Sequence, residues 1–387
     1  MTATQEPEVR TIESAAPPVR FARGWHCIGL AESFRDGKPH GIEAFGTKLV
    51  VFTDSEGELK VLDSYCRHMG GDLSQGTTKG DEVACPFHDW RWGGDGKCKR
   101  IPYAKRVPMR ARTRTWQTLE RNDQLFVWHD PQGNPPPEDV TIPEIRGFNE
   151  GTWTDWSWNS VLIENSHCRE IVDNVVDMAH FFYVHYAFPV YFRNVFEGHI
   201  ATQYSQTKAR ADADIYTSGE AGGPTGPGSA EATYFGPSYM IDYETTPMVF
   251  GDVQAVLINC HYPVSPTSFQ LQWGISVKHP EGFTEDQANE MAAGFAGGVE
   301  TGFLQDIEIW RNKAKIDNPL LCDEDGPVYQ LRRWYEQFYV DVEDVTPEMV
   351  QRFEYEIDVE RANEIWEKEV EENLAAGRTV VTAPGNK

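Results

Sequence analysis

The chain of 387 residues lacks several features that would assign it to common classes of protein. No apolar run approaches the roughly 20 residues that a membrane-spanning helix needs, so we predict no membrane span. The net charge of −25 argues against binding to nucleic acids or to anionic membranes, because both would repel the chain. No glycine-rich dinucleotide fingerprint is evident, which argues against a nicotinamide site in this chain.

Cysteine is also scarce. The seven cysteines are odd in number and widely spaced, which argues against a disulfide framework.

The first twenty residues are polar, contain proline and have no apolar signal core. We therefore expect residues 1–18 to be a disordered lead-in, and the protein to be cytoplasmic.

One spacing motif stands out from this background. Cys66-x-His68 is followed, sixteen residues later, by Cys85-x-x-His88. Two thiolates can hold one iron and two imidazoles the other, which is the ligand set of a Rieske [2Fe–2S] cluster with a potential of roughly −150 to +300 mV. Cys₂His₂ is also a zinc set, but zinc sites usually pair Cys with Cys and His with His. Because each half-motif here carries one cysteine and one histidine, we predict an electron-accepting iron–sulfur cluster.

A basic segment follows the second half-motif. Between Arg91 and Arg114 the chain has nine basic residues and one acid, Asp95, although the whole chain is strongly acidic. A solvated face is the simplest interpretation. The alternative hypothesis is a docking surface for an acidic electron donor, since complementary charge accelerates encounter and salt weakens the effect.

Composition divides the chain into two domains. Residues 19–130 are rich in short β patterns and contain the cluster motif, residues 131–141 form a proline-rich linker, and residues 142–379 mix helix and strand before a tail at 380–387. In the first domain, strands are predicted at Trp25–Leu30, Leu49–Thr53, Leu59–Leu62 and Leu125–His129.

The second domain should contain both long helices and strands. Residues Ser218–Ser229 form a Gly- and Pro-rich loop that is a candidate flap. Helices are predicted at Glu164–His180, Glu285–Lys313 and Thr346–Ala375, and strands at Val195–Gln206, Ala255–Pro263 and Ser268–Val277.

A second metal site is predicted in this domain. His180 and His185, with one carboxylate, would make the facial triad of a non-haem Fe(II) oxygenase, although a histidine pair alone is more often a core or surface pair. Residues five apart do not share a helix face, so the helix should end or bulge between them. The best carboxylate is Asp306, which shares a helix face with Phe303 and Trp310, whereas Glu308 points elsewhere.

Two polar residues precede His180 at intervals of three. Asp177 is placed one turn before His180 and could hydrogen-bond its second ring nitrogen, as carboxylates around metal sites do. Asn174, one turn earlier, would lie on the same face. We predict that both support catalysis.

These motifs together (C-x-H, C-x-x-H, N-x-x-D-x-x-H-x-x-x-x-H and the late Gln305-Asp306) resemble the oxygenase component of Rieske non-haem iron oxygenases over most of the chain. Within that group, Cys85–Cys98, Ile101–Pro108 and Thr301–Trp310 look like the bacterial 3-ketosteroid 9α-hydroxylases. Asp89, directly after the second cluster histidine, departs from the broader family, in which many members have glycine there. The resemblance implies an α+β fold, with an N-terminal all-β Rieske domain and a helix-grip-like catalytic domain that holds a mononuclear iron.

The resemblance also implies a function. It implies a terminal monooxygenase of steroid catabolism that hydroxylates a 3-ketosteroid, such as 4-androstene-3,17-dione, at the 9α position with O₂. Electrons would come from NADH through a separate reductase that carries flavin and a [2Fe–2S] centre. A head-to-tail homotrimer is implied, in which Asp177 would link His180 to His88 of the partner subunit. The substrate would lie against Val175, Tyr234, Met240, Asn259, Phe303 and Trp310.

Two alternatives remain open at this point. Another Rieske oxygenase, such as a sterol desaturase, a demethylase or an aromatic-ring dioxygenase, would keep both metals and change the reaction. A pure Rieske electron carrier would need no second iron, so His180, His185 and Asp306 distinguish it from an enzyme.

Overall fold

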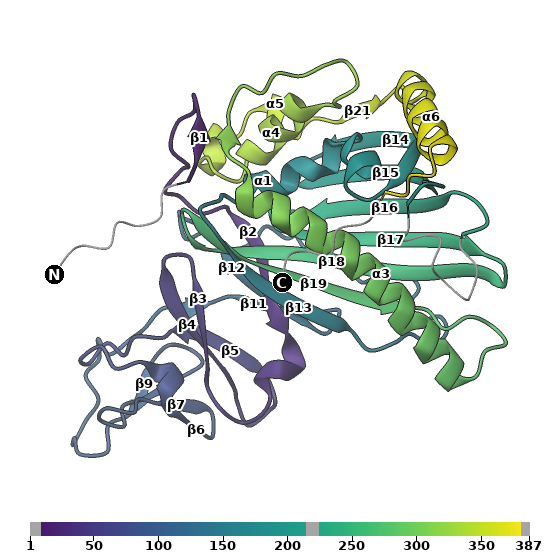
Figure 1. Ribbon diagram of the computed structural model, residues 1–387. Coiled ribbons are helices and arrows are strands. Elements are labelled where there is room, and N and C mark those ends of the chain that lie inside the picture. Colours follow the sequence, from purple (N-terminus) through teal and green to yellow (C-terminus); the bar gives the residue numbers. More distant parts are fainter. Residues whose placement is uncertain (1–8, 214–223, 381–387) are drawn as a thin grey trace.

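The computed structural model describes residues 9–213 and 224–380 of the chain (Figure 1). Three small antiparallel sheets form the N-terminal part, and one large antiparallel sheet crossed by a long helix forms the C-terminal part. The predicted α+β class, with an all-β first domain, is confirmed.

The first domain is built from short strands whose apolar residues alternate toward small cores. All four strands predicted here are present, with bounds that differ by one or two residues. One sheet has the order β10-β5-β4-β3, a second β11-β12-β2, and a third β6-β7-β8-β9. The strands are β2 (Gly24–Leu30), β3 (His40–Ala44), β4 (Thr47–Thr53), β5 (Leu59–Asp63), β6 (Thr77–Lys79), β7 (Glu82–Ala84), β8 (Arg91–Gly93), β9 (Cys98–Arg100), β10 (Thr115–Trp116), β11 (Thr118–Arg121) and β12 (Gln124–His129).

The second domain is organised around one eight-stranded antiparallel sheet of order β13-β19-β18-β17-β16-β15-β14-β21. The prediction of a single strand at Val195–Gln206 was wrong, because the chain reverses at Gly198 (φ 57°) between β14 and β15. The predicted strand Ser268–Val277 is confirmed as β19. The other strands are β13 (Ser157–Glu164), β14 (Ala187–Glu197), β15 (Ile200–Ala209), β16 (Gly228–Phe235), β17 (Tyr239–Met248), β18 (Gly251–Ser265) and β21 (Phe353–Glu356).

Helix α3 (Glu285–Asn312) crosses one face of this sheet (Figure 1). It begins with a capping box, in which the Gln287 N–H donates to Thr284 Oγ1 and the Thr284 N–H donates to Gln287 Oε1. Its 28 residues make it about 42 Å long. Phe303, Ile307 and Trp310 pack against sheet residues such as Trp273 in a shared core.

The helix predicted at Glu164–His180 is divided into three pieces. Helix α1 (Arg169–Val172) continues into a 3₁₀ turn, η3 (Asp173–Val176), and Asp177 then takes an extended conformation (φ −85°, ψ 96°) before α2 (His180–Tyr183). The chain does end a helix between His180 and His185, as predicted. The additional break at Asp177 was not predicted.

The helix predicted at Thr346–Ala375 is likewise interrupted. Pro347 begins only one turn, α5 (Pro347–Val350), and strand β21 then pairs with the edge strand β14. Helix α6 (Glu360–Ala375) follows, and the remaining helix of this region is α4 (Val328–Glu336). Pairing to an open sheet edge outweighed the helical tendency of residues 353–356.

The lead-in is ordered where the structure describes it. Strand β1 (Thr11–Ile12) pairs in parallel with β20 (Lys315–Ile316), and Lys315 Nζ donates to the Ala15 carbonyl. Disorder was therefore the wrong prediction for residues 9–18. Part of the predicted flap, residues 218–223, lies outside the described residues, and its last two residues belong to β16.

The two domains pack directly on each other. Trp25 and Phe126 of the first domain share a core with Tyr239 and Ile258 of the large sheet. Gln272 Nε2 also donates to the Cys27 carbonyl across the interface, at 3.1 Å. None of the helices in the described part of the chain is both long and apolar enough to cross a membrane.

Candidate metal centres and substrate cavity

The two halves of the cluster motif lie on two adjacent loops, one after β5 and one between β7 and β8. Each loop closes on itself, since the Gly70 N–H donates to the Cys66 carbonyl and the Asp89 N–H to the Cys85 carbonyl. The loops touch at Gly71, where a Cβ atom would lie 2.7 Å from Cys85 Sγ. Glycine is required there by that close approach.

The ligands of the two loops face one another. The rings of His68 and His88 lie 4.8 Å apart, and Trp90 stacks on His68 at 4.4 Å. Cys66 and Cys85 are buried, whereas both histidines are partly accessible. The cysteine side of the site therefore lies inside the domain and the histidine side near its surface.

The donor set fits an iron–sulfur cluster. Burial raises the pKa of the Cys66 thiol to about 11, so a thiolate needs a cation and hydrogen-bond donors to form. One donor is present, because the Trp92 indole N–H points at Cys66 Sγ from 3.3 Å. His88 Nδ1 is sealed from solvent without a hydrogen-bond partner, which suits a nitrogen that binds metal.

The second centre brings together the three residues predicted from sequence. One ligand atom from each of His180, His185 and Asp306 lies within 4.8 Å of the others. His185 Nε2 is 3.3 Å from Asp306 Oδ2, and the two histidine rings are 4.9 Å apart. Two imidazoles and one carboxylate suit a mononuclear iron with open positions, so these residues would hold it.

Asp177 contacts His180 in a way that differs from the prediction. The His180 Nδ1 atom meets the backbone carbonyl of Asp177, while the nearest carboxylate oxygen is 3.8 Å from the ring. That carboxylate accepts from the His180 backbone N–H at 3.2 Å. Burial alone would lower the pKa of His180, but the hydrogen bond and charge of Asp177, with Asp306 adding, raise this pKa.

Asp177 is also half exposed. Its side chain keeps 49% of its accessible surface, whereas that of Asp306 keeps 9%. Burial of the carboxyl would raise the pKa of Asp177, but the interactions with His180 outweigh it and lower the pKa. An ionised carboxylate therefore reaches from the histidine ligand toward the surface of the chain.

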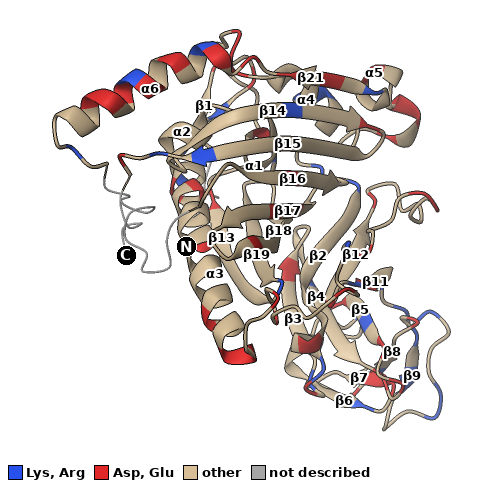
Figure 2. Ribbon diagram, turned by 90° about the vertical axis from the view of Figure 1, so that its right-hand side faces the viewer, with Lys and Arg blue, Asp and Glu red and all other residues tan. Residues whose placement is uncertain are grey.

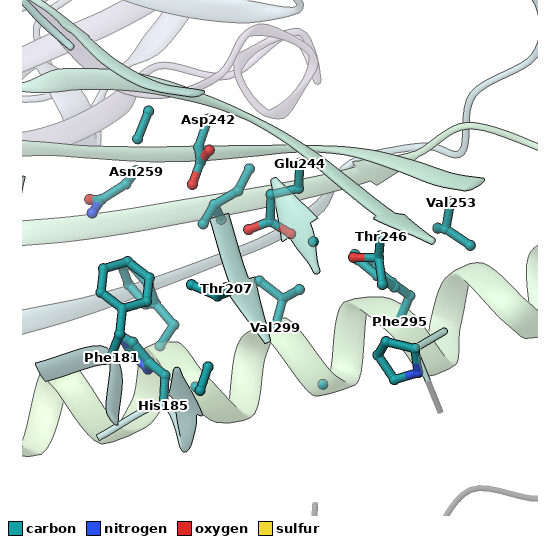
Figure 3. Close-up of a pocket in the computed structure, with 18 of the residues that line it drawn as sticks. Phe181, His185, Thr207, Asp242, Glu244, Thr246, Val253, Asn259, Phe295 and Val299 are labelled. Carbon is teal, nitrogen blue, oxygen red and sulfur yellow. The ribbon is translucent and has the colours of Figure 1, made fainter. Parts of the chain in front are cut away.

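A large cavity opens from the triad and runs between α3 and the sheet (Figure 3). Its volume is about 1090 Å³, at the upper end of ligand sites in proteins. Small residues of α3 keep it wide, since a Cβ atom on Gly294 or Gly298 would meet no atom within 4 Å. The cavity suits a long, rigid and mostly apolar molecule.

Every residue that the sequence assigned to the substrate lines this cavity, and so does Asn174. Asn174 Oδ1 accepts from the Trp310 indole at 3.3 Å, which fixes that ring beside the triad. The predicted residues are Val175, Tyr234, Met240, Asn259, Phe303 and Trp310. The roles of these residues remain predictions.

Other cavity residues escaped the sequence prediction. Phe181 and Gln203 line it, and Asp242 and Glu244 present two carboxyl groups to it. Alternation along β17 was a usable signal, because residues 240, 242 and 244 must share a face once Met240 is assigned to the cavity.

An N-terminal cluster domain of this kind, followed by a histidine–carboxylate triad under a large antiparallel sheet, defines a Rieske non-haem iron oxygenase. Family models agree, since the Rieske [2Fe–2S] domain matches residues 24–113 and the 3-ketosteroid 9α-hydroxylase C-terminal domain matches residues 127–339. The second match covers more than half of the chain. The chain belongs to the 3-ketosteroid 9α-hydroxylase family of Rieske oxygenase components.

Known relatives support this assignment. A 3-ketosteroid-9-alpha-monooxygenase oxygenase component of Rhodococcus rhodochrous is 65% identical over 95% of this chain and 94% of its own length. The corresponding protein of Mycobacterium tuberculosis is 60% identical over 96% of each chain. A cholesterol 7-desaturase of Ciona intestinalis is more distant, with 28% identity over 86% of this chain and 71% of its own length.

Solved structures show the same fold at low identity. NdmB of Pseudomonas putida superposes with a TM-score of 0.67 and 17% identity, covering 88% of this chain and 99% of its own. A dicamba monooxygenase bound to 3,6-dichlorosalicylic acid gives a TM-score of 0.62 and 19% identity, over 84% and 98% of the two chains. The chain therefore shares its overall fold with these proteins.

Proposed function

We propose that this chain is the terminal oxygenase that hydroxylates a 3-ketosteroid at the 9α position, in steroid catabolism. The observation that carries the proposal is the position of the His180, His185 and Asp306 triad at one end of an apolar cavity of about 1090 Å³. A cavity of this size accommodates a fused-ring substrate. The names of the Rhodococcus and Mycobacterium relatives indicate that substrate class.

The chain contributes positioning and exclusion of water. When bound, the mononuclear iron supplies O₂ activation for the hydroxylation of a C–H bond. Phe303 and Trp310, both buried, form the wall next to the triad, and Asn174 holds Trp310 in place. A rigid substrate pressed against these rings presents one carbon to the metal position.

Asp177 is proposed to support electron delivery to the triad. Replacing Asp177 with alanine should leave the cluster and the iron in place but lower turnover about 10- to 100-fold, because His180 loses its charged neighbour. Iron content, the visible spectrum of the cluster and steroid hydroxylation are measured on the same sample. Full turnover with both metals present would contradict the role.

A homotrimer, in which the cluster of one subunit serves the triad of the next, is supported by the surface around the cluster. Large apolar side chains are exposed on and near the cluster loops of the single chain, which is typical of an interface. They are Tyr65 (49%), Met69 (64%), Phe87 (58%) and Tyr103 (65%).

We propose that the basic segment 91–114 binds an NADH-dependent reductase carrying flavin and [2Fe–2S]. Figure 2 shows basic residues along the loop that follows β9. Arg91, Lys97 and Lys99 are neutralised by Asp89 or Asp95. Six residues of the segment are exposed and have no ion pair within the described ranges: Arg100, Lys105, Arg106, Arg110, Arg112 and Arg114.

Charge reversal tests this surface. Arg106→Glu with Arg110→Glu should slow cluster reduction by the reductase about tenfold at low salt and weaken its salt dependence. Lys38→Glu is the control, since Lys38 is an exposed lysine elsewhere in the same domain. Unchanged rates and salt dependence in the double variant would exclude the segment as the docking surface.

A cytoplasmic location is supported by the cysteines. All seven lie in the described part of the chain, where none forms a disulfide, and six of them are buried. This state suits a reducing compartment.

The function is tested by NADH-driven turnover of 4-androstene-3,17-dione with a competent reductase. Product mass, O₂ uptake and peroxide are followed together. One hydroxylated product per O₂ is expected. A desaturated product would instead favour the chemistry named for the Ciona relative, and O₂ converted mainly to peroxide would mean that the substrate is wrong.

A further inference from the structure

Two carboxyl groups of the cavity wall have no part in the metal site. Asp242 and Glu244 lie two residues apart on β17, and alternation directs both toward the cavity. Figure 3 shows them projecting from the sheet between Asn259 and Thr246, on the wall that faces α3. Acidic groups are unusual in a cavity that otherwise suits an apolar molecule.

Their neighbours leave both groups open to the cavity. In the sheet register, Asp242 lies between Ala232 and Leu257, and Glu244 lies between Ala230 and Ala255. Alanine side chains are too short to cover a carboxyl group. Within residues 9–213 and 224–380, neither acid has an ion pair, and no lysine or arginine lines the cavity.

The surroundings favour the neutral form of both acids. Burial, with Glu244 and Glu231 adding, raises the pKa of Asp242 well above its usual value, and burial raises the pKa of Glu244 to about 7. Glu290 faces the same cavity from α3, whereas Glu231 lies on the other face of the sheet and pairs with Arg146 at 2.8 Å. Among the described residues that line the cavity, no lysine or arginine offsets the charges of Asp242, Glu244 and Glu290.

A neutral carboxylic acid needs a hydrogen-bond acceptor. Asp242 Oδ1 is sealed inside the sheet without a partner, so its other oxygen is the one offered to the cavity. Asn259 is arranged similarly, with its Oδ1 sealed and unpartnered. It lies diagonally across from Asp242 on β18. Its amide nitrogen therefore supplies a second donor beside the first, and no hydrogen bond from either donor to another described residue is present.

We propose that Asp242 and Glu244 bind the substrate as neutral acids, and that Asp242 donates a hydrogen bond to a ketone oxygen of the steroid. This inference rests on the proposed function and adds residues that determine its specificity. A ketone has only lone pairs to offer, so it matches two converging donors. An anionic group would be bound less favourably at the same place, because it would lie beside two carboxyl groups.

The test compares ligands that differ in one oxygen. Dissociation constants of the holoprotein are measured by anaerobic calorimetry for 4-androstene-3,17-dione, androst-4-en-3-one and androst-4-en-17-one. The wild type should bind one of the monoketones at least about tenfold more weakly than the diketone. Asp242→Leu should remove that difference, and Asp242→Asn should restore most of it, because an amide N–H can replace the acid as donor.

The pH dependence of steroid binding provides an independent test. The dissociation constant of the diketone should rise in the wild type as the pH increases through about 7, where Glu244 loses its proton. Glu244→Gln should make the constant independent of pH in that range. Glu231→Gln is the matched control, since it removes a nearby carboxylate from the opposite face of the sheet and should retain the selectivity.

The outcomes separate the two proposals. The role of Asp242 is overturned if Asp242→Leu has the same ketone selectivity as the wild type. This comparison requires that the variant is folded and contains both metals. No binding of any of the three steroids to the wild type overturns the proposed function itself. Steroid binding with a pH dependence that survives Glu244→Gln overturns the role of Glu244.

Discussion

Asp89, directly after the second cluster histidine, takes a left-handed backbone conformation (φ 55°). Glycine would have no steric penalty there, which agrees with the glycine that the resemblance to the broader Rieske oxygenase family leads us to expect at this position. Asp89 compensates through its carboxylate, which binds Lys79 at 2.6 Å and Arg91 at 2.9 Å. The departure from the family pattern therefore preserves the loop that holds His88.

Trp92 offers a direct test at the cluster. Its indole N–H donates to Cys66 Sγ, and a donor to a ligand sulfur favours the reduced, more negative cluster. Trp92→Phe should therefore lower the reduction potential by about 60 mV, the equivalent of one such hydrogen bond for a one-electron couple. Potentials are measured by spectroscopic redox titration.

The control for this change lies in the same domain. Trp116→Phe also removes an indole donor, but that donor binds Asp63 and not the cluster, so the potential should stay unchanged. Equal potentials in the wild type and Trp92→Phe would show that this hydrogen bond does not tune the cluster.

Among the predicted site residues, the candidate metal ligands are those whose clustering followed most directly from the sequence. Cys66, His68, His180 and Asp306 could be chosen because few residue types bind iron and their spacing restricts the choice. The carboxyls of Asp242 and Glu244 were missed because an acid in a strand is usually solvent-exposed. Only the strand register shows that Ala232 and Leu257 flank Asp242 and that two alanines flank Glu244, on the face that lines the cavity.

At the scale of elements, the local sequence pattern predicted continuous helices and strands well. It did not predict the positions at which a helix is interrupted. The capped helix α3 and strand β19 were predicted almost to the residue, because each has a continuous pattern along its length. The break at Asp177 depends on contacts made later in the chain, such as the packing of α4 against η3 residues Val175 and Val176. Periodicity within the segment itself could not reveal it.

Helix α6 stabilises the short metal-bearing helix α2. Trp366 stacks on Phe182 at 4.7 Å and donates from its indole to the Tyr183 hydroxyl at 3.1 Å. Trp366→Ala should cost about 3–5 kcal/mol of local packing and reduce the iron content of the mononuclear site without affecting the cluster. Iron analysis, cluster absorbance and thermal unfolding measure the effect.

The neighbouring residue supplies the control for this prediction. Ile365 is 58% exposed, so Ile365→Ala should leave both stability and iron content near wild-type values. If Trp366→Ala retained all its iron while unfolding at a lower temperature, α6 would stabilise the fold without supporting the metal site.

At the scale of the whole molecule, the two domains place their functional parts at different surfaces. The cluster histidines face outward among exposed apolar residues, and Asp177 carries a half-exposed carboxylate beside the triad. Both features are explained if the cluster of one subunit docks near Asp177 of the next. Association of subunits would then be part of catalysis and not only of stability.

Mixed oligomers test this arrangement. His68→Ala removes a cluster ligand and Asp306→Ala removes an iron ligand, so each variant alone should be inactive. In a head-to-tail trimer that contains both, one subunit with an intact cluster always precedes one with an intact triad. Co-expressed and doubly tagged trimers should therefore regain about one third of wild-type hydroxylation. Variants mixed after separate purification, without exchange of subunits, should stay inactive, and inactive co-expressed trimers with the expected metal content would mean that electrons stay within one chain.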